Sequence, residues 1–272
     1  MVSPKHVFYL CSPKELAISV KSSAPNRSPV LGHISHEAPR DIVFIHGAGG
    51  NSLLWRRTLQ GLTGASFAYA VDLPGHPNGE ISCKTIGDYT EVLHAFIRES
   101  RLDRPAVCGH SMGGAVVLTL ALKHPEDAGA LVLVSTGAKL GVAPEILEGL
   151  RGEPLRAIEN VITPWSFNSI DLGLGREARA ALSVSNLPVF LNDYLACQGF
   201  DVRPDLPKIT PKTLVVCGDK DRMTPPKWSH YLKANIPGSE LFFVKDSGHM
   251  LPLEKPEPLS RVIQSFLTGL SR

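Results

Sequence analysis

The pentapeptide Gly109-His110-Ser111-Met112-Gly113 places a serine between two glycines, where a predicted strand turns into a predicted helix. The apolar run before it, residues 105–108, is of strand type, and the apolar run after it, residues 114–122, is typical of a buried helix. So tight a turn leaves room only for glycine on either side of the serine, and it lifts the serine hydroxyl above the sheet. The pattern therefore predicts that Ser111 is a nucleophile.

A serine hydroxyl reacts poorly at neutral pH unless a base lies within hydrogen-bond reach and a further group orients that base. His249 follows the last predicted strand, residues 240–244, and Asp221 follows the strand before it, residues 213–217. In a parallel sheet these strand ends share one edge, where ligands bind in open α/β folds. Asp219 lies in the same turn, but we expect Asp221 to be the partner because the carboxylate must reach beyond the strand end.

Acyl transfer would also need hydrogen-bond donors for the negative charge that develops on the substrate oxygen. One predicted donor is the backbone N–H of Met112, at a helix N-terminus where the dipole favours negative charge. The second is expected from Ala48, in the loop His46-Gly47-Ala48-Gly49-Gly50 that follows a predicted strand at residues 41–45. Its glycines let the backbone approach a substrate, and the loop lacks the spacing of a phosphate-binding loop.

The elements that must position these residues alternate between strand and helix from residue 41 onward. This order is typical of a parallel sheet with right-handed crossovers and helices on both faces. Two earlier β-like runs are predicted to be antiparallel edge strands. The sequence thus predicts an α/β fold with a mostly parallel, eight-stranded sheet, whose strand-like runs are residues 7–10, 16–21, 41–45, 66–71, 105–108, 130–135, 213–217 and 240–244.

The strand pattern stops between about residues 139 and 207, where three helical patterns are joined by Gly/Pro turns. The helical patterns lie at residues 144–150, 154–162 and 176–197. We expect a helical cap over residues 139–206, inserted into a core made of residues 1–138 and 207–272 and lying above Ser111. The predicted wall of the substrate pocket consists of Gly49, His110, Trp165, Leu187, Phe190 and Met250.

Composition narrows the class of partner. The 272 residues carry a formal net charge of +2 without a basic or acidic block, which disfavours nucleic acid or an anionic membrane surface as the main partner. The five cysteines are dispersed without C-x-x-C spacing, so neither a disulfide framework nor structural zinc is expected. We expect no cofactor either. There is no signal-peptide core and no apolar run near the roughly 18 residues of a membrane span. We therefore expect a cytoplasmic protein.

Together these segments resemble the α/β-hydrolase superfamily, in its serine-nucleophile, carboxylesterase-like branch with a helical cap. The segments that carry the resemblance are His46-Gly47, Asp72-Leu73-Pro74-Gly75-His76, residues 109–113, residues 218–225 and Ser247-Gly248-His249. The chain order Ser, Asp, His is also that of the family. The resemblance implies the α/β-hydrolase fold, with Ser111 as nucleophile, His249 as base and acid, Asp221 as its orienter, and Ala48 and Met112 as oxyanion donors.

The activity that the resemblance implies is hydrolysis of a small-molecule ester of short to medium acyl length, without a cofactor. Haloalkane dehalogenases and epoxide hydrolases of this fold carry Asp where this chain has Ser111. C–C hydrolases usually carry Asn before the nucleophile and Trp after the triad histidine, where this chain has His110 and Met250. Two alternatives stay open: C–C bond or lactone hydrolysis on the same triad, and a small-ligand receptor with little turnover.

Overall fold

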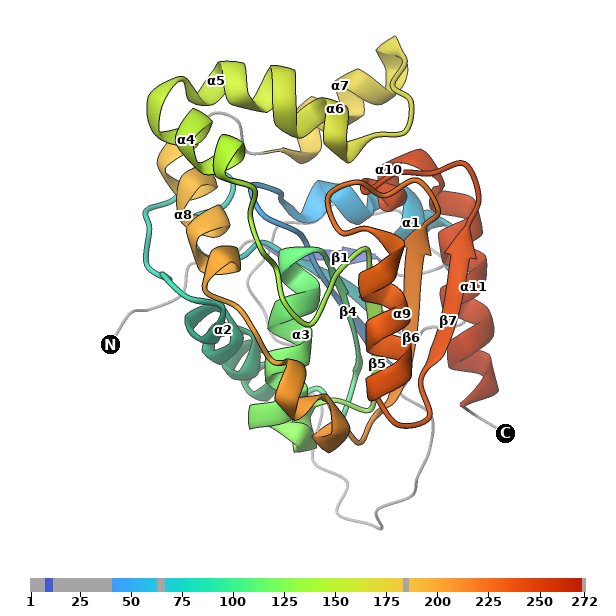
Figure 1. The fold of residues 1–272 in the computed structure, drawn as a ribbon. Coiled ribbons are helices and arrows are strands. Elements are labelled where there is room, and N and C mark those ends of the chain that lie inside the picture. The colour runs from blue at the N-terminus through green and yellow to red at the C-terminus, as the bar shows by residue number, and fades with distance from the viewer. Residues whose placement is uncertain (1–7, 12–40, 63–66, 183–185, 271–272) are drawn as a thin grey trace.

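The computed structural model describes residues 8–11, 41–62, 67–182 and 186–270. Their strands form one seven-stranded sheet in the order β1-β3-β2-β4-β5-β6-β7 (Figure 1). The strands are β1 (Phe8–Cys11), β2 (Asp41–Ile45), β3 (Phe67–Val71), β4 (Ala106–His110), β5 (Ala130–Val134), β6 (Lys212–Gly218) and β7 (Glu240–Val244). Only β1 is antiparallel to its neighbour β3, and the other six strands all run parallel.

The mostly parallel sheet flanked by helices is confirmed, but the predicted number of eight strands is wrong for the described residues, which hold seven. The predicted edge strand at residues 7–10 corresponds to β1, whereas the one at residues 16–21 falls outside the described residues. The six parallel strands begin and end within two residues of the predicted runs, because each run is mostly apolar and is bounded by polar or turn-forming residues.

Helices cover both faces of the sheet. One face carries α2 (Ile86–Glu99), α3 (Met112–Lys123) and α9 (Pro226–Asn235), and the other carries α1 (Arg56–Gln60), α10 (Leu251–Glu254) and α11 (Pro256–Gly269). Side chains of β2 point alternately to the two faces of the sheet and so contact both helical layers. Val43 and Ile45 pack into the cluster with α2, α3 and α9, while Ile42 and Phe44 pack into the cluster with α1 and α11.

Helix α3, which starts directly after Ser111, is buried at every residue from Met112 to Ala121. It packs against β4, β5, α2 and α8 (Leu187–Gln198), which explains why its sequence is apolar on all sides. Although apolar, α3 has only 12 residues, and within the described part of the chain no helix is long and apolar enough to cross a membrane.

Between β5 and β6 the chain forms a helical insertion, defined here as residues 139–206. Its helices are α4 (Pro144–Gly152), α5 (Pro154–Ala157), α6 (Thr163–Ser166), α7 (Leu172–Ala181) and α8, with a π-helical turn (Ile158–Ile162) joining α5 to α6. Figure 1 shows α4 to α7 lying across the carboxyl-terminal ends of the parallel strands, the same end of the sheet at which β4 leads into α3. The single helix predicted at residues 176–197 is wrong: Pro188 in the first turn of α8 begins a new helix and cannot continue α7.

Candidate active site

Ser111 occupies the turn between β4 and α3 with a φ of 52° and a ψ of −117°. A positive φ is strained for a residue with a side chain, so the surrounding chain must hold this conformation in place. The flanking glycines show how closely the backbones approach. A Cβ on Gly113 would lie 2.5 Å from the carbonyl oxygens of Ile45 and His46, and a Cβ on Gly109 would overlap Gly113. The predicted strand-to-helix turn around Ser111 is thus present in the structure.

His249 and Asp221 lie together at the carboxyl ends of β7 and β6, as the sequence predicts. Nδ1 of the buried His249 ring is 2.9 Å from Oδ2 of Asp221. The same carboxylate accepts two backbone N–H groups on Oδ1 and the Thr224 hydroxyl on Oδ2, at 2.8–2.9 Å. Asp219 does not contact the histidine ring and instead faces the backbone N–H of Ser247 at 3.4 Å. The turn after β6 therefore brings Asp221, rather than Asp219, to His249.

The surroundings of Asp221 keep it ionised. Burial alone would raise the pKa of this carboxyl, but the charge and the hydrogen bond of His249 and the donors of Thr224 outweigh burial, so its pKa lies below the ordinary value. An ionised Asp221 favours the His249 tautomer with its proton on Nδ1. Nε2 of His249 then carries the lone pair that a general base needs.

The loop after β2 is fixed by hydrogen bonds at both ends. The backbone N–H of Gly50 donates to the carbonyl of Gly47 over 3.0 Å, which closes a tight turn around Ala48. The His46 ring donates from Nδ1 to the Gly47 carbonyl and accepts the Leu73 N–H at Nε2. Burial holds the pKa of His46 well below its ordinary value, so this ring is neutral. Its two hydrogen bonds connect the loop after β2 to the loop after β3.

One predicted oxyanion donor, Met112, directly follows Ser111, and the other, Ala48, lies in the loop after β2. Ala48 and Ser111 line the same cavity. Met112 is the first residue of α3, and an N–H in the first turn of a helix has no acceptor within that helix. The positive end of the helix dipole at Met112 favours negative charge at the same place.

A cavity of about 210 Å³ lies beside Ser111 and His249, between the carboxyl ends of the strands and the helical insertion. Four of the six predicted pocket residues line it: His110, Trp165, Phe190 and Met250. The other two, Gly49 and Leu187, are not among its lining residues. Gly49 is covered by the Phe190 ring, and Leu187, the first residue of α8, packs against the core of the insertion.

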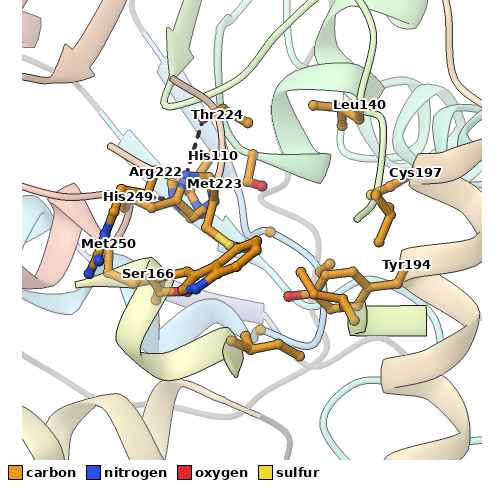
Figure 2. A pocket seen from close by; sticks show the side chains of 18 of the residues that line it. His110, Leu140, Ser166, Tyr194, Cys197, Arg222, Met223, Thr224, His249 and Met250 are labelled. Carbon is orange, nitrogen blue, oxygen red and sulfur yellow. Dashed lines mark hydrogen bonds between the residues drawn. The ribbon is translucent and has the colours of Figure 1, made fainter. Parts of the chain in front are cut away.

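The cavity also contains side chains that the sequence analysis does not single out. Among them are Tyr194, Met223, Thr224 and Trp228. Figure 2 shows Tyr194 reaching in from α8, opposite Met223 and His249. Tyr194 shares the i, i+4, i+7 spacing of Phe190 and Cys197, which indicates one face of α8, so this periodicity could have identified it.

His110, next to the serine, lines the cavity and is also hydrogen-bonded to the backbone of His249. Its Nε2 donates to the backbone carbonyl of His249 over 2.9 Å. Burial, followed by the nearby charge of His249, lowers the pKa of His110 to about 3, so the ring is neutral. His110 therefore fixes the backbone from which the His249 ring projects.

One group of side chains outside the cavity could be considered for a metal. His94, His124 and Asp127 offer three ligand atoms within 4.8 Å of one another. However, the two imidazole rings are stacked 3.9 Å apart at 12°, so their in-plane lone pairs run parallel and do not converge on one ion. Nδ1 of His94 is already hydrogen-bonded to Asp127 at 2.5 Å, which explains the cluster as a structural contact.

Comparison with known proteins agrees with this geometry. The model of the alpha/beta hydrolase family matches residues 42–262, a span that includes Ser111, Asp221 and His249. The chain belongs to the α/β-hydrolase family. The resemblance seen in the sequence is thereby confirmed, and the motifs that carry it fall inside the matched span.

Named relatives of this α/β-hydrolase are esterases and other hydrolases. It is 28% identical to a pimeloyl-acyl-carrier-protein methyl ester esterase of Neisseria meningitidis, over 86% of this chain and 96% of that protein. It is also 28% identical to a 2-hydroxy-6-oxononadienedioate/2-hydroxy-6-oxononatrienedioate hydrolase of Pseudomonas putida, over 85% and 89% of the two chains. The solved structure of a thermophilic esterase matches with a TM-score of 0.75 and 32% identity, over 86% and 92%. These matches are consistent with a carboxylic ester hydrolase.

Proposed function

We propose that this α/β-hydrolase is a serine carboxylesterase that cleaves short to medium acyl esters through an acyl-enzyme on Ser111. The observation that carries the proposal is the placement of Ser111, in its strained turn, on the same cavity as His249, which is hydrogen-bonded to Asp221. A serine, a base and a group that orients the base are the parts that covalent acyl transfer requires.

In the proposed mechanism, Nε2 of His249 takes the proton of the Ser111 hydroxyl while Oγ attacks the ester carbonyl carbon. The backbone N–H groups of Ala48 and Met112 stabilise the resulting oxyanion. His249 then gives its proton to the leaving alcohol, which leaves an acyl-enzyme. A water molecule, deprotonated by His249, attacks the acyl group, and collapse of the second tetrahedral intermediate returns the carboxylic acid and free Ser111.

The size and lining of the cavity support the proposed acyl length. Aliphatic and aromatic side chains from the insertion face the reaction centre, including Ile146, Ile162, Trp165 and Phe190. We propose that residues 139–206 act as a cap that selects the substrate, above a core of residues 1–138 and 207–272. The cytoplasmic location stays a prediction.

The Pseudomonas relative named above favours C–C hydrolysis as the second candidate. In that reaction, this protein would use Ser111 and His249 on a ketone in place of an ester. The buried His110 stands where those hydrolases usually carry Asn, and it is occupied by the His249 carbonyl. The residue type at position 110 supports the ester assignment, because His110 offers no amide group beside the nucleophile.

The proposed function is tested by turnover of a p-nitrophenyl ester series from acetate to palmitate. We expect turnover that is highest between acetate and octanoate, and at least roughly 10³-fold lower in S111A. A wild-type protein that turns over none of the esters would contradict the esterase assignment, as would an S111A variant that keeps its activity. Ring-fission diketones, assayed in parallel, would show turnover if the second candidate were correct.

A further inference from the structure

Asp193 is a buried carboxylate on α8 that binds three donors from three other parts of the chain. Its exposed fraction is 0%. Oδ2 accepts the backbone N–H of Gly49 and the ring of His76, each at 2.8 Å, and Oδ1 accepts the hydroxyl of Tyr89 at 2.6 Å. A buried carboxylate is costly unless it is paired and hydrogen-bonded, so this arrangement calls for an explanation.

His76 supplies the countercharge. Its Nε2 faces Asp193, while its Nδ1 lies 3.2 Å from the carbonyl oxygens of both Leu73 and Pro74. Because both ring nitrogens face acceptors, both must carry protons, and His76 is an imidazolium. Burial lowers its pKa, but the hydrogen bond and the charge of Asp193 outweigh burial and raise the pKa above the ordinary value. The result is a buried ion pair between α8 and the loop after β3.

The third donor connects this ion pair to the loop that holds Ala48. Gly49 directly follows Ala48 and has a φ of +63°. Phe190, one helical turn before Asp193, lies against Gly49 so closely that a Cβ there would overlap the ring. Helix α8 thus holds Gly49 by a charge-assisted hydrogen bond on one side and by an aromatic ring on the other.

We propose that Asp193 is a positioning residue that fixes the oxyanion loop through the Gly49 N–H and so sets the place of the Ala48 N–H. The inference rests on the proposed function, because it assigns the oxyanion role to Ala48. By this role, α8 of the insertion positions the oxyanion loop in addition to lining the pocket. A buried carboxylate paired with His76 suits this task, because it anchors the loop without leaving a net charge beside the developing oxyanion.

The proposal is tested with D193N, which keeps the size of the side chain, and with the matched control Y89F. Both variants disturb the same carboxylate cluster, but only D193N alters the acceptor of Gly49. We expect D193N to lower kcat for p-nitrophenyl butyrate at least roughly tenfold with KM within about threefold, because a displaced oxyanion donor weakens only the transition state. Y89F should keep kcat within about threefold.

A boronic acid inhibitor separates positioning from general stability. Its tetrahedral adduct on the serine mimics the transition state, so its Ki should rise in D193N in proportion to the loss of kcat/KM. The melting temperatures of D193N and Y89F show whether the two variants are destabilised to a similar extent. If kcat and Ki in both variants followed only the loss of stability, or if D193N kept wild-type values, the proposal would be overturned.

G49A provides an independent variant if D193N does not fold. An added Cβ would push the loop away from Phe190 without changing any charge, so we expect the same loss of kcat and the same rise in Ki; wild-type values in G49A would overturn the proposal. S111A keeps this test distinct from that of the function. If S111A retained turnover, both the esterase assignment and the role of Asp193 would be contradicted. If S111A were inactive but D193N kept wild-type kcat, only the role of Asp193 would be contradicted.

Discussion

The choice between Asp219 and Asp221 depends on which carboxylate the turn after β6 directs at His249. Three donors besides the histidine ring converge on Asp221, from the backbone of Met223 and from the backbone and hydroxyl of Thr224. With all four partners acting as donors, the site suits a carboxylate, which only accepts. An amide could satisfy only part of this set and would turn an N–H group toward other N–H groups.

We therefore expect D221N to lower kcat by roughly 10³- to 10⁴-fold, because an amide at this position favours the wrong tautomer of His249. D219N, the matched control in the same turn, should stay within about threefold of the wild type. Steady-state turnover of p-nitrophenyl butyrate measures both. The assignment of Asp221 fails if D219N is the inactive variant.

At the scale of single residues, the sequence predicts Ser111, Asp221 and His249 because each has a local signal. Two glycines flank the serine, and the other two residues lie in the turns that follow strand-like runs. Residues such as Asp193 carry no such signal, since the partners of this carboxylate lie 104 or more positions away in the chain. A clue was available, because a charged residue between Phe190 and Tyr194 stands on the apolar face of a helix.

At the scale of elements, α8 joins the insertion to the α/β core through the ion pair of Asp193 with His76. The groups that face His76 besides this partner are the carboxylate of Asp72 and the neutral ring of His46, whose centroid is 4.7 Å away. Since the pKa of His76 is raised in the folded protein, the stability it contributes is complete below its unfolded pKa, about 6.5, and is lost as the pH rises through the folded value.

The stability difference between wild type and D193N should therefore shrink with rising pH. We expect D193N to lower the free energy of unfolding by about 3 kcal/mol at pH 6, as for a broken buried pair, and by clearly less at pH 9. Urea denaturation at the two pH values measures this difference. In the Y89F control, the difference from wild type should be the same at both values. A D193N difference that stays constant or grows toward pH 9 would refute the charged state of His76.

Element boundaries show where sequence reasoning is strong and where it fails. Helix starts can be read from the sequence where a proline stands at the first position, as at Pro226 of α9 and Pro256 of α11. The insertion was harder to predict, because its apolar residues serve both its own core and the cavity. Periodicity therefore merged α7 with α8 and missed the π-helical turn at Ile158–Ile162.

At the scale of the whole molecule, the insertion contacts both sides of the reaction centre. On one side, α8 holds the loop with Ala48. On the other side, the backbone N–H of Met250 donates to the Ser166 carbonyl over 3.0 Å. The Glu254 carboxylate accepts the N–H groups of Asn168 and Gly248 at 2.9 Å, which ties the insertion to the loop with His249. The core carries Ser111, Asp221 and His249, while the insertion contacts the loop with Ala48 and the loop with His249.

The central claim, that Ser111 forms a covalent acyl-enzyme, is tested most directly by intact-protein mass spectrometry after reaction with a fluorophosphonate. We expect a single adduct per chain, assigned to Ser111 by peptide mapping and lost in S111A, together with loss of esterase turnover in proportion to labelling. An unlabelled Ser111 in a protein that hydrolyses esters, or an adduct on another residue, would contradict the account.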